Sequence, residues 1–243
     1  MSSDHGAVSR ETPLVPPVAR GVFASRMELA DRYAALLAEE GVVRGLIGPR
    51  EVPRLWTRHL LNCAVVSDEL ATGTDVADVG SGAGLPGVVL AIRRPDLRMT
   101  LIEPLLRRAT FLTEAVDRLG LDNVEVLRAR AEELHGVRDY TVVTSRAVAP
   151  LPRLLAWCMP LVRQGGAVVA MKGRSADREL DDAQAHLRRW GVGPANVHML
   201  GDDLLDPPTT VVRLEATRPS ELQWRNSGAG SNPGRRRRGK DRR

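Results

Sequence analysis

The spacing of hydrophobic and polar positions changes near residue 73. In "VFASRMELADRYAALL", from Val22 to Leu37, apolar residues recur every three or four positions, which predicts an amphipathic helix with Gly41 as its C-terminal cap. The stretch from Glu51 to Leu70 has the same spacing and predicts a second helix. Residues 1–20 are polar and rich in proline and are expected to be disordered. We therefore expect an N-terminal helical extension at residues 21–71.

After residue 73, short apolar runs alternate with helical stretches. The runs predict strands near 75–79, 98–103, 123–128, 140–145, 166–171 and 209–216, with a weaker strand near 196–200. The stretches between them predict helices near 86–94, 105–119, 150–163 and 176–190. Such alternation is typical of an α/β fold with a mostly parallel sheet covered on both faces. We expect one domain of about seven strands at residues 72–217, the last two forming an edge hairpin. Seven strands with the last inserted antiparallel would match a Rossmann-like methyltransferase fold.

Charge and cysteine content narrow the class of protein. The formal net charge is +5, but the segment from Arg225 to Arg243 holds eight Lys or Arg side chains against one Asp, so the rest of the chain is slightly acidic. Residues 218–243 are expected to be a disordered Arg-rich tail, which either contacts nucleic-acid phosphates or only adds solubility.

The sequence shows no signal peptide and no apolar stretch of about 20 residues. We expect a cytoplasmic protein without a metal site or a membrane partner, in which Cys63 and Cys158 are buried free thiols.

A glycine-rich turn follows the first predicted strand. Four glycines crowd the stretch "DVGSGAGLPG", more than a tight turn requires, and glycine lets a ligand approach the backbone closely. The segment from Gly82 to Gly87 matches the dinucleotide pattern G-x-G-x-x-G, whereas Asp78 to Gly84 has the form D-x-G-x-G-x-G, typical of S-adenosylmethionine (SAM) sites. The loop alone leaves both ligands open. Its candidate cofactor contacts are Gly80, Ser81, Gly82, Gly84 and Leu85.

Residues at the tips of the next strands favour SAM. Glu103 ends the second strand, where a carboxylate can accept from ribose hydroxyls of either ligand. Ala131 and Glu132 follow the third strand, where a carboxylate can accept from the exocyclic amine of adenine. Both glutamates have the alternative of being surface carboxylates. Arg146 ends the fourth strand, at the edge where ligands bind in such sheets, with a structural salt bridge as the alternative.

Basic residues suggest where a nucleic acid would bind. Arg50, Arg54 and Arg58 recur every four positions, which gives one helix face that is either solvated or in contact with phosphates. His59 is either a satisfied core group or a contact near the target. Lys172 is the only lysine outside the tail and ends the fifth strand, which suggests that a compact ammonium is needed there.

Four motifs, in this order, carry a family resemblance. They are Arg58-His59 in "TRHLLNC", the loop from Asp78 to Gly87, Ser145-Arg146-Ala147, and Lys172-Gly173. Over residues 22–217 they resemble the RsmG family, also called glucose-inhibited division protein B, which methylates N7 of a guanine in bacterial 16S rRNA. The resemblance implies SAM contacts at Gly80, Leu85, Glu103, Ala131, Glu132 and Arg146. Family members often show Asp-Ser where this chain has Asn62-Cys63, a departure expected to affect substrate contacts rather than SAM binding.

The resemblance implies direct methyl transfer from SAM to N7 of a specific guanine in a decoding-region loop. The expected partner is 16S rRNA or the small ribosomal subunit, and a monomer suffices. Lys172 and Arg58 are candidate RNA contacts, so Lys172→Ala and Arg58→Ala are expected to keep SAM binding and lose methylation. Other hypotheses are a methyltransferase of another RNA, a protein or a small molecule, a catalytically silent RNA-binding protein, and an NAD-linked oxidoreductase that uses the glycine loop.

Overall fold

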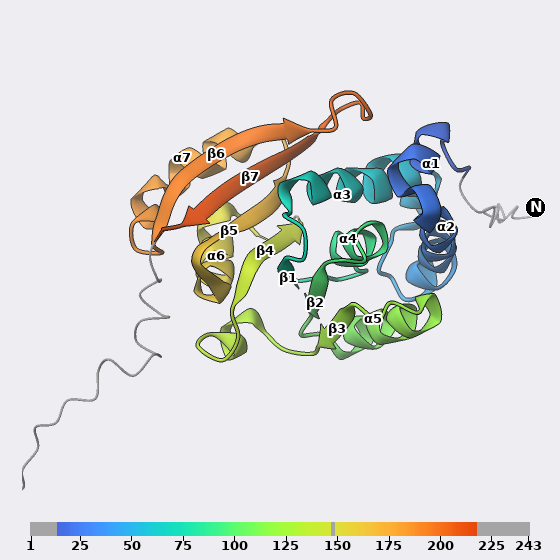
Figure 1. Cartoon of the computed structure of the whole chain (residues 1–243), viewed down its shortest axis with the longest axis horizontal. Helices are drawn as coiled ribbons and strands as arrows, with labels where there is room; N and C mark the ends of the chain where they lie inside the picture. The colour runs from blue at the N-terminus through green and yellow to red at the C-terminus, as the bar shows by residue number, and fades with distance from the viewer. Residues whose placement is uncertain (1–13, 147–148, 218–243) are drawn as a thin grey trace, which may run out of the picture.

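The sheet has the predicted Rossmann-like topology (Figure 1). The computed structural model describes residues 14–146 and 149–217, and within them seven strands form one sheet in the order β3-β2-β1-β4-β5-β7-β6. β1 to β5 are parallel to one another, and β7 runs antiparallel to both β5 and β6. The strands are β1 (Asp75–Val79), β2 (Arg98–Ile102), β3 (Val124–Leu127), β4 (Tyr140–Arg146), β5 (Val162–Lys172), β6 (Val192–Leu200) and β7 (Thr209–Ala216). The predicted sheet and its edge hairpin are confirmed.

Two strands begin earlier than the sequence pattern indicated. β5 was expected from residue 166 and begins at Val162, which pairs with Tyr140 before a bulge in the ladder. β6 was expected from residue 196 and begins at Val192, which pairs with Ala216. The added residues are held by partners far along the chain, and such pairing leaves little local signal.

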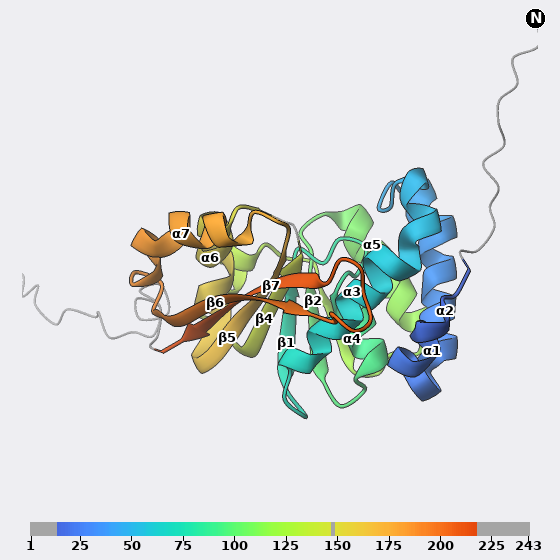
Figure 2. The same ribbon diagram turned by 90° about the horizontal axis from the view of Figure 1, so that it is seen from above.

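Helices cover both faces of the sheet because side chains alternate along each strand. Val76 belongs to the core under α4 (Gly87–Arg93) and α5 (Leu106–Leu119), whereas Ala77 belongs to the core under α6 (Leu151–Cys158) and α7 (Ala176–Leu187). In Figure 2, α6 and α7 lie to the left and the N-terminal helices to the right. Short 3-10 turns complete this part of the chain: η6 (Ala131–Leu134) and η7 (Met159–Leu161).

The N-terminal extension packs on the α4 face and shares its core with the sheet. Its helical segments are α1 (Pro17–Phe23), η1 (Ala24–Arg26), α2 (Met27–Leu36), η2 (Leu37–Gly41), η3 (Pro49–Arg54), η4 (Leu55–Leu60), α3 (Leu61–Ala64) and η5 (Val65–Glu69). The segments from η3 to η5 form the second predicted helix as one continuous run of 3-10, π and α turns. The expectation of disorder up to residue 20 is wrong for residues 17–20, which belong to α1, where a proline fits the first turn. Residues 1–13 and the tail at 218–243 lie outside the described residues.

The first long helix does not end at Gly41, so that prediction is wrong. Gly41 is buried, and the helical turns continue past it to Gly45, whose φ of +64° provides the left-handed cap. The carbonyl of Gly41 accepts hydrogen bonds from the backbone N–H groups of Leu46 and Ile47, at 2.8 and 3.2 Å. A Cβ at Gly41 would lie 3.6 Å from Cγ1 of Ile47, an ordinary contact, so neither the cap nor close packing requires glycine there.

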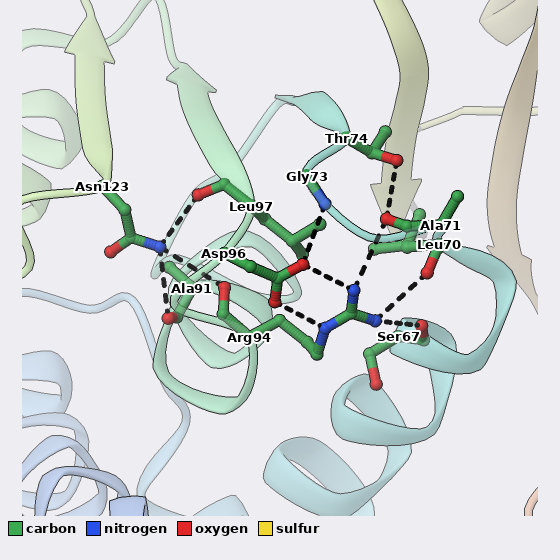
Figure 3. Close-up of polar contacts among 10 residues, drawn as sticks. All are labelled: Ser67, Leu70, Ala71, Gly73, Thr74, Ala91, Arg94, Asp96, Leu97 and Asn123. Carbon is green, nitrogen blue, oxygen red and sulfur yellow. Dashed lines mark hydrogen bonds and ion pairs between the residues drawn. The ribbon is translucent and has the colours of Figure 1, made fainter.

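A polar cluster joins the extension to the end of the sheet opposite the glycine loop (Figure 3). The guanidinium of Arg94 pairs with Asp96 and donates to the carbonyls of Ser67 and Leu70 at the end of η5, at 3.3 and 3.1 Å. The carboxylate of Asp96 also accepts from the backbone N–H of Gly73 at 2.9 Å. The bond to Leu70 gives a partner to a carbonyl at the helix end, whereas the carbonyl of Ser67 also accepts from the backbone N–H of Leu70 at 3.1 Å.

Two composition-based expectations can be compared with the structure. Cys63 and Cys158 are both buried free thiols, as expected. Among the helices of residues 14–146 and 149–217, none combines the length and the apolar character that crossing a membrane requires.

Candidate cofactor and substrate site

The glycine loop after β1 has a backbone that side chains would not allow. Gly80, Gly82 and Gly84 have φ values of +74°, +58° and +92°. The extension braces this loop, because the buried hydroxyl of Tyr33 in α2 donates to the carbonyl of Ala83 at 2.6 Å. A Cβ at Gly84 would lie 2.8 Å from that hydroxyl oxygen. Tyr33 therefore holds the loop in place. The backbone of the loop carries no side chain at Gly80, Gly82 and Gly84.

Asp78, at the end of β1, is a fully buried carboxyl with one oxygen unused. Its Oδ2 accepts from the backbone N–H of Gly87 at 3.0 Å, and its Oδ1 has no hydrogen-bond partner among the described residues. Burial raises the pKa of Asp78 to about 7, although the hydrogen bond from Gly87 and the charge of Arg146 act in the opposite direction. A buried acceptor without a partner is costly, so this oxygen is suited to receive a donor from a ligand.

Glu103 is fixed in orientation at the tip of β2. Its side chain is only 1% exposed, and its two oxygens accept from the backbone N–H groups of Gly82 and Leu105, both at 3.0 Å. A carboxylate has about four lone-pair sites, so these two bonds leave acceptors for the hydroxyl groups of a sugar. The sequence placed Glu103 and the glycine loop at neighbouring strand tips, and the structure joins them directly.

The other predicted cofactor contacts occupy the same edge of the sheet in different ways. The side chain of Leu85 packs in the core, so a contact from Leu85 would use its backbone. Ser81 is buried, and its hydroxyl donates to the carbonyl of Asp78 at 2.8 Å. Ala131 is buried and Glu132 is exposed in the first turn of η6, after β3. The free acceptor positions of Glu103 suit a ligand with a sugar diol, and SAM has one.

Arg146, at the end of β4, reaches back to the N-terminal extension. Its guanidinium donates to Nδ1 of His59, and its Nη1 lies 3.4 Å from Sγ of Cys63. Burial and the charge of Arg146 lower the pKa of His59, even though Glu51 lies 3.0 Å from its Nε2. His59 is therefore a buried, neutral, hydrogen-bonded imidazole, and it links the predicted Arg-His pair to Arg146. Ala147 lies outside the described residues.

Lys172 does not join this group. Its side chain is 5% exposed, and its ammonium donates to the carbonyl of Ala149 at 2.6 Å and to Glu179 in α7 at 2.8 Å. The other contact of that carboxylate oxygen is the backbone N–H of Leu151, at 2.9 Å. The compact ammonium thus joins Ala149, just before α6, to α7, and an RNA contact by Lys172 stays a prediction.

The predicted arginine strip is at the surface. Arg50, Arg54 and Arg58 are all exposed, and Arg58 has a loose ion pair with Glu51, with Nε 3.8 Å from Oε2. The strip belongs to the same helical run as His59, whose side chain points inward instead. One run of helix thus carries an exposed basic face and the buried contact to Arg146.

Three residues of the site escaped sequence reasoning. Tyr33 lies far from the loop along the chain and shows no local signal. Glu179 is likewise hidden, since its pairing with Lys172 depends on how α7 packs. Glu51 precedes His59 by two helical turns, and that spacing alone could have indicated a shared helix face.

Comparison with known proteins agrees with this geometry. The family described as GidB, rRNA small subunit methyltransferase G, matches residues 26–205. A ribosomal RNA small subunit methyltransferase G from Nocardioides sp. is 62% identical over 218 residues, covering 89% of this chain and 87% of that protein. The protein of the same name from Thermobifida fusca is 57% identical, with 82% and 84% covered. A solved SAM-dependent methyltransferase from Aquifex aeolicus shares the fold, with a TM-score of 0.50, 19% identity, and 69% and 98% covered. The chain belongs to the GidB family of rRNA small subunit methyltransferases.

Proposed function

We propose that this chain transfers a methyl group from SAM to N7 of a specific guanine in a decoding-region loop of 16S rRNA. The observation that carries the proposal is the joined pair of Glu103 and the glycine loop, in a chain of this family. The orphan Oδ1 of Asp78 is a further acceptor at this end of the sheet, which a donor on the cofactor would satisfy. An NAD-linked reaction is set aside, since the family is one of methyltransferases.

SAM, when bound, supplies an electrophilic methyl group on a positively charged sulfur. Guanine N7 has a lone pair and no proton, so none of the residues of the chain has to act as a general base. The protein then contributes mainly by holding the acceptor and the donor in line, and such positioning can account for several kcal/mol of the barrier. Glu103 and the loop backbone would orient the cofactor, and Arg146, which ends β4 at the same edge of the sheet, would contact it there.

The exposed arginine strip would give the RNA a place to bind. Arg50, Arg54 and Arg58 would contact phosphates, which position the RNA without reading its sequence. A base must leave its stack to enter a pocket, so a single-stranded loop is a better substrate than a duplex. The proposed setting is the cytoplasm, with a monomer acting on rRNA within the small subunit.

The test uses purified chain, methyl-labelled SAM and small ribosomal subunits that lack the modification. We expect label in 16S rRNA and strand cleavage, by chemistry specific for N7-methylguanine, at one guanine. Naked 16S rRNA in a parallel reaction tells whether the assembled subunit is needed. SAM binding without any labelled RNA would contradict the rRNA substrate and leave the cofactor assignment standing.

A further inference from the structure

Glu51 lies in η3, outside the glycine loop and the strand tips, yet a chain of contacts joins it to the site. Its Oε2 is 3.0 Å from Nε2 of His59, and the opposite ring nitrogen of His59 contacts the guanidinium of Arg146. His59 is 7% exposed, whereas the side chain of Glu51 is 33% exposed. The chain of contacts therefore runs from the surface, through a buried imidazole, to the carboxyl end of β4.

The donors and acceptors in this chain fix the tautomer of His59. A guanidinium has only N–H donors, so Nδ1 of His59 must be the acceptor. The imidazole proton then resides on Nε2 and is donated to Glu51, which must be ionised to accept it fully. The pKa values agree in direction: the hydrogen bond from His59 lowers that of Glu51, and burial together with Arg146 lowers that of His59.

The effect at the far end is to fix Arg146. One of its terminal nitrogens is held by His59, and the other by the Cys63 thiol at 3.4 Å. Both holding residues come from the extension, whereas Arg146 ends β4 beside Ser145, whose hydroxyl donates to the carbonyl of Val79 at 2.8 Å. The guanidinium is thus held by two residues of the extension, and a guanidinium has five N–H donors, more than these two contacts use.

Glu51 has a second neighbour, which does not account for its placement. Its Oε2 is 3.8 Å from Nε of Arg58, whose side chain is 60% exposed. Exposed pairs of this length contribute little, because both charges stay solvated. The contact with His59 is shorter and largely buried, so it determines the orientation of the carboxylate.

We propose that Glu51 is a positioning residue for methyl transfer, acting through His59 to hold the guanidinium of Arg146 at the cofactor end of the sheet. Its influence on turnover rests on the proposed function, while its influence on the tautomer of His59 does not. Glu51→Ala removes the acceptor. Glu51→Gln keeps a neutral acceptor of nearly the same shape and serves as the conservative variant.

The first measurement is the tautomer of His59 in long-range ¹H–¹⁵N correlation spectra, with its signals assigned by their loss in His59→Asn. We expect the Nε2–H form in the native chain and in Glu51→Gln. In Glu51→Ala nothing holds the ring in place against Arg146, so Nδ1 loses its fixed donor and we expect a mixture of tautomers. Arg58→Ala is the matched control, since it removes the other neighbour of Glu51 and should leave the tautomer unchanged. A single Nε2–H form in Glu51→Ala would overturn the proposal.

The second measurement is function in the same variants, with thermal melting to show that each is folded. We expect Glu51→Ala to weaken SAM binding, measured by calorimetry, and to lower kcat for rRNA methylation, each by about tenfold, with Glu51→Gln restoring most of both. A changed tautomer with unchanged SAM affinity and kcat would refute the positioning role. A native chain that binds SAM and holds the Nε2–H tautomer but leaves rRNA unlabelled would instead refute the proposed function.

Discussion

Removing the ammonium of Lys172 tests whether this residue stabilises the site through its buried contacts with Ala149 and Glu179. In Lys172→Met the carbonyl of Ala149 loses a donor at 2.6 Å, and Glu179 loses its cationic partner at 2.8 Å. Loss of one partner from a buried ion pair costs roughly 3–5 kcal/mol. The side chain of Glu179 is 23% exposed and keeps its hydrogen bonds from Leu151 and Ser175, which offset part of the loss.

We therefore expect Lys172→Met to lower the free energy of unfolding by about 2 kcal/mol, as measured by urea titration followed by tryptophan fluorescence. Burial alone would raise the pKa of Glu179, but Lys172 and Ser175 hold it low. Without Lys172 the pKa of Glu179 is higher, so the variant should also become less stable as the pH rises through that pKa. The double variant Lys172→Met with Glu179→Gln should cost less than the sum of the single changes, because no unpaired charge remains.

The result that would refute this account is a Lys172→Met variant of native stability that binds SAM normally and has lost methylation. That outcome is the one expected of a direct RNA contact, as the sequence alone suggested. Strict additivity of the Lys172 and Glu179 changes would also contradict the buried pair. Arg174→Ala is a matched control, since Arg174 is an exposed cation two residues further on and should change stability by less than about 0.5 kcal/mol.

Three further predictions concern the glycine loop, Asp78 and the arginine strip. Gly87→Ala would place a Cβ against Leu101 and 2.8 Å from Oδ2 of Asp78, so thermal melting should show a loss of about 2 kcal/mol or more, whereas Gly173→Ala, with open space around it, should be neutral. Burial raises the pKa of Asp78 to about 7, so the folded chain keeps a proton that the unfolded chain releases above about pH 4. The free energy of unfolding should therefore fall between about pH 4 and pH 7. Urea titrations of Asp78→Asn should lack this fall. Arg58→Ala removes an exposed side chain and should keep SAM affinity by calorimetry while losing most rRNA labelling; full labelling would exclude the strip as an RNA contact.

The parts of the fold and site that follow from local pattern were predictable. The strand cores and the loop from Asp78 to Gly87 are made of residue types with strong preferences for one backbone conformation. Glu103 could be placed because parallel strands end at a common edge of the sheet. The ends of β5 and the cap at Gly45 were missed, since bulges and cap geometry depend on partners elsewhere.

The roles of individual polar side chains were harder to predict. The sequence singled out Lys172 as unusual but could not reveal Glu179 as its partner, and it left His59 open between a core group and a substrate contact. Both questions are decided by which charged group lies nearby after folding, which helix spacing does not encode.

The hydroxyl of Tyr33 under the carbonyl of Ala83 has a consequence for modularity. The Rossmann-like sheet is the part that methyltransferases of this kind share, and it is tempting to treat the helices before it as an exchangeable attachment. Here the N-terminal helices supply the Tyr33 hydroxyl, which donates to the loop. The space beside this hydroxyl is too small for any residue but glycine at position 84. A chimaera that transplanted only the sheet, or fitted it with the N-terminal helices of a relative, would have to carry this tyrosine with it. The glycine loop and α2 thus form one structural unit in this chain.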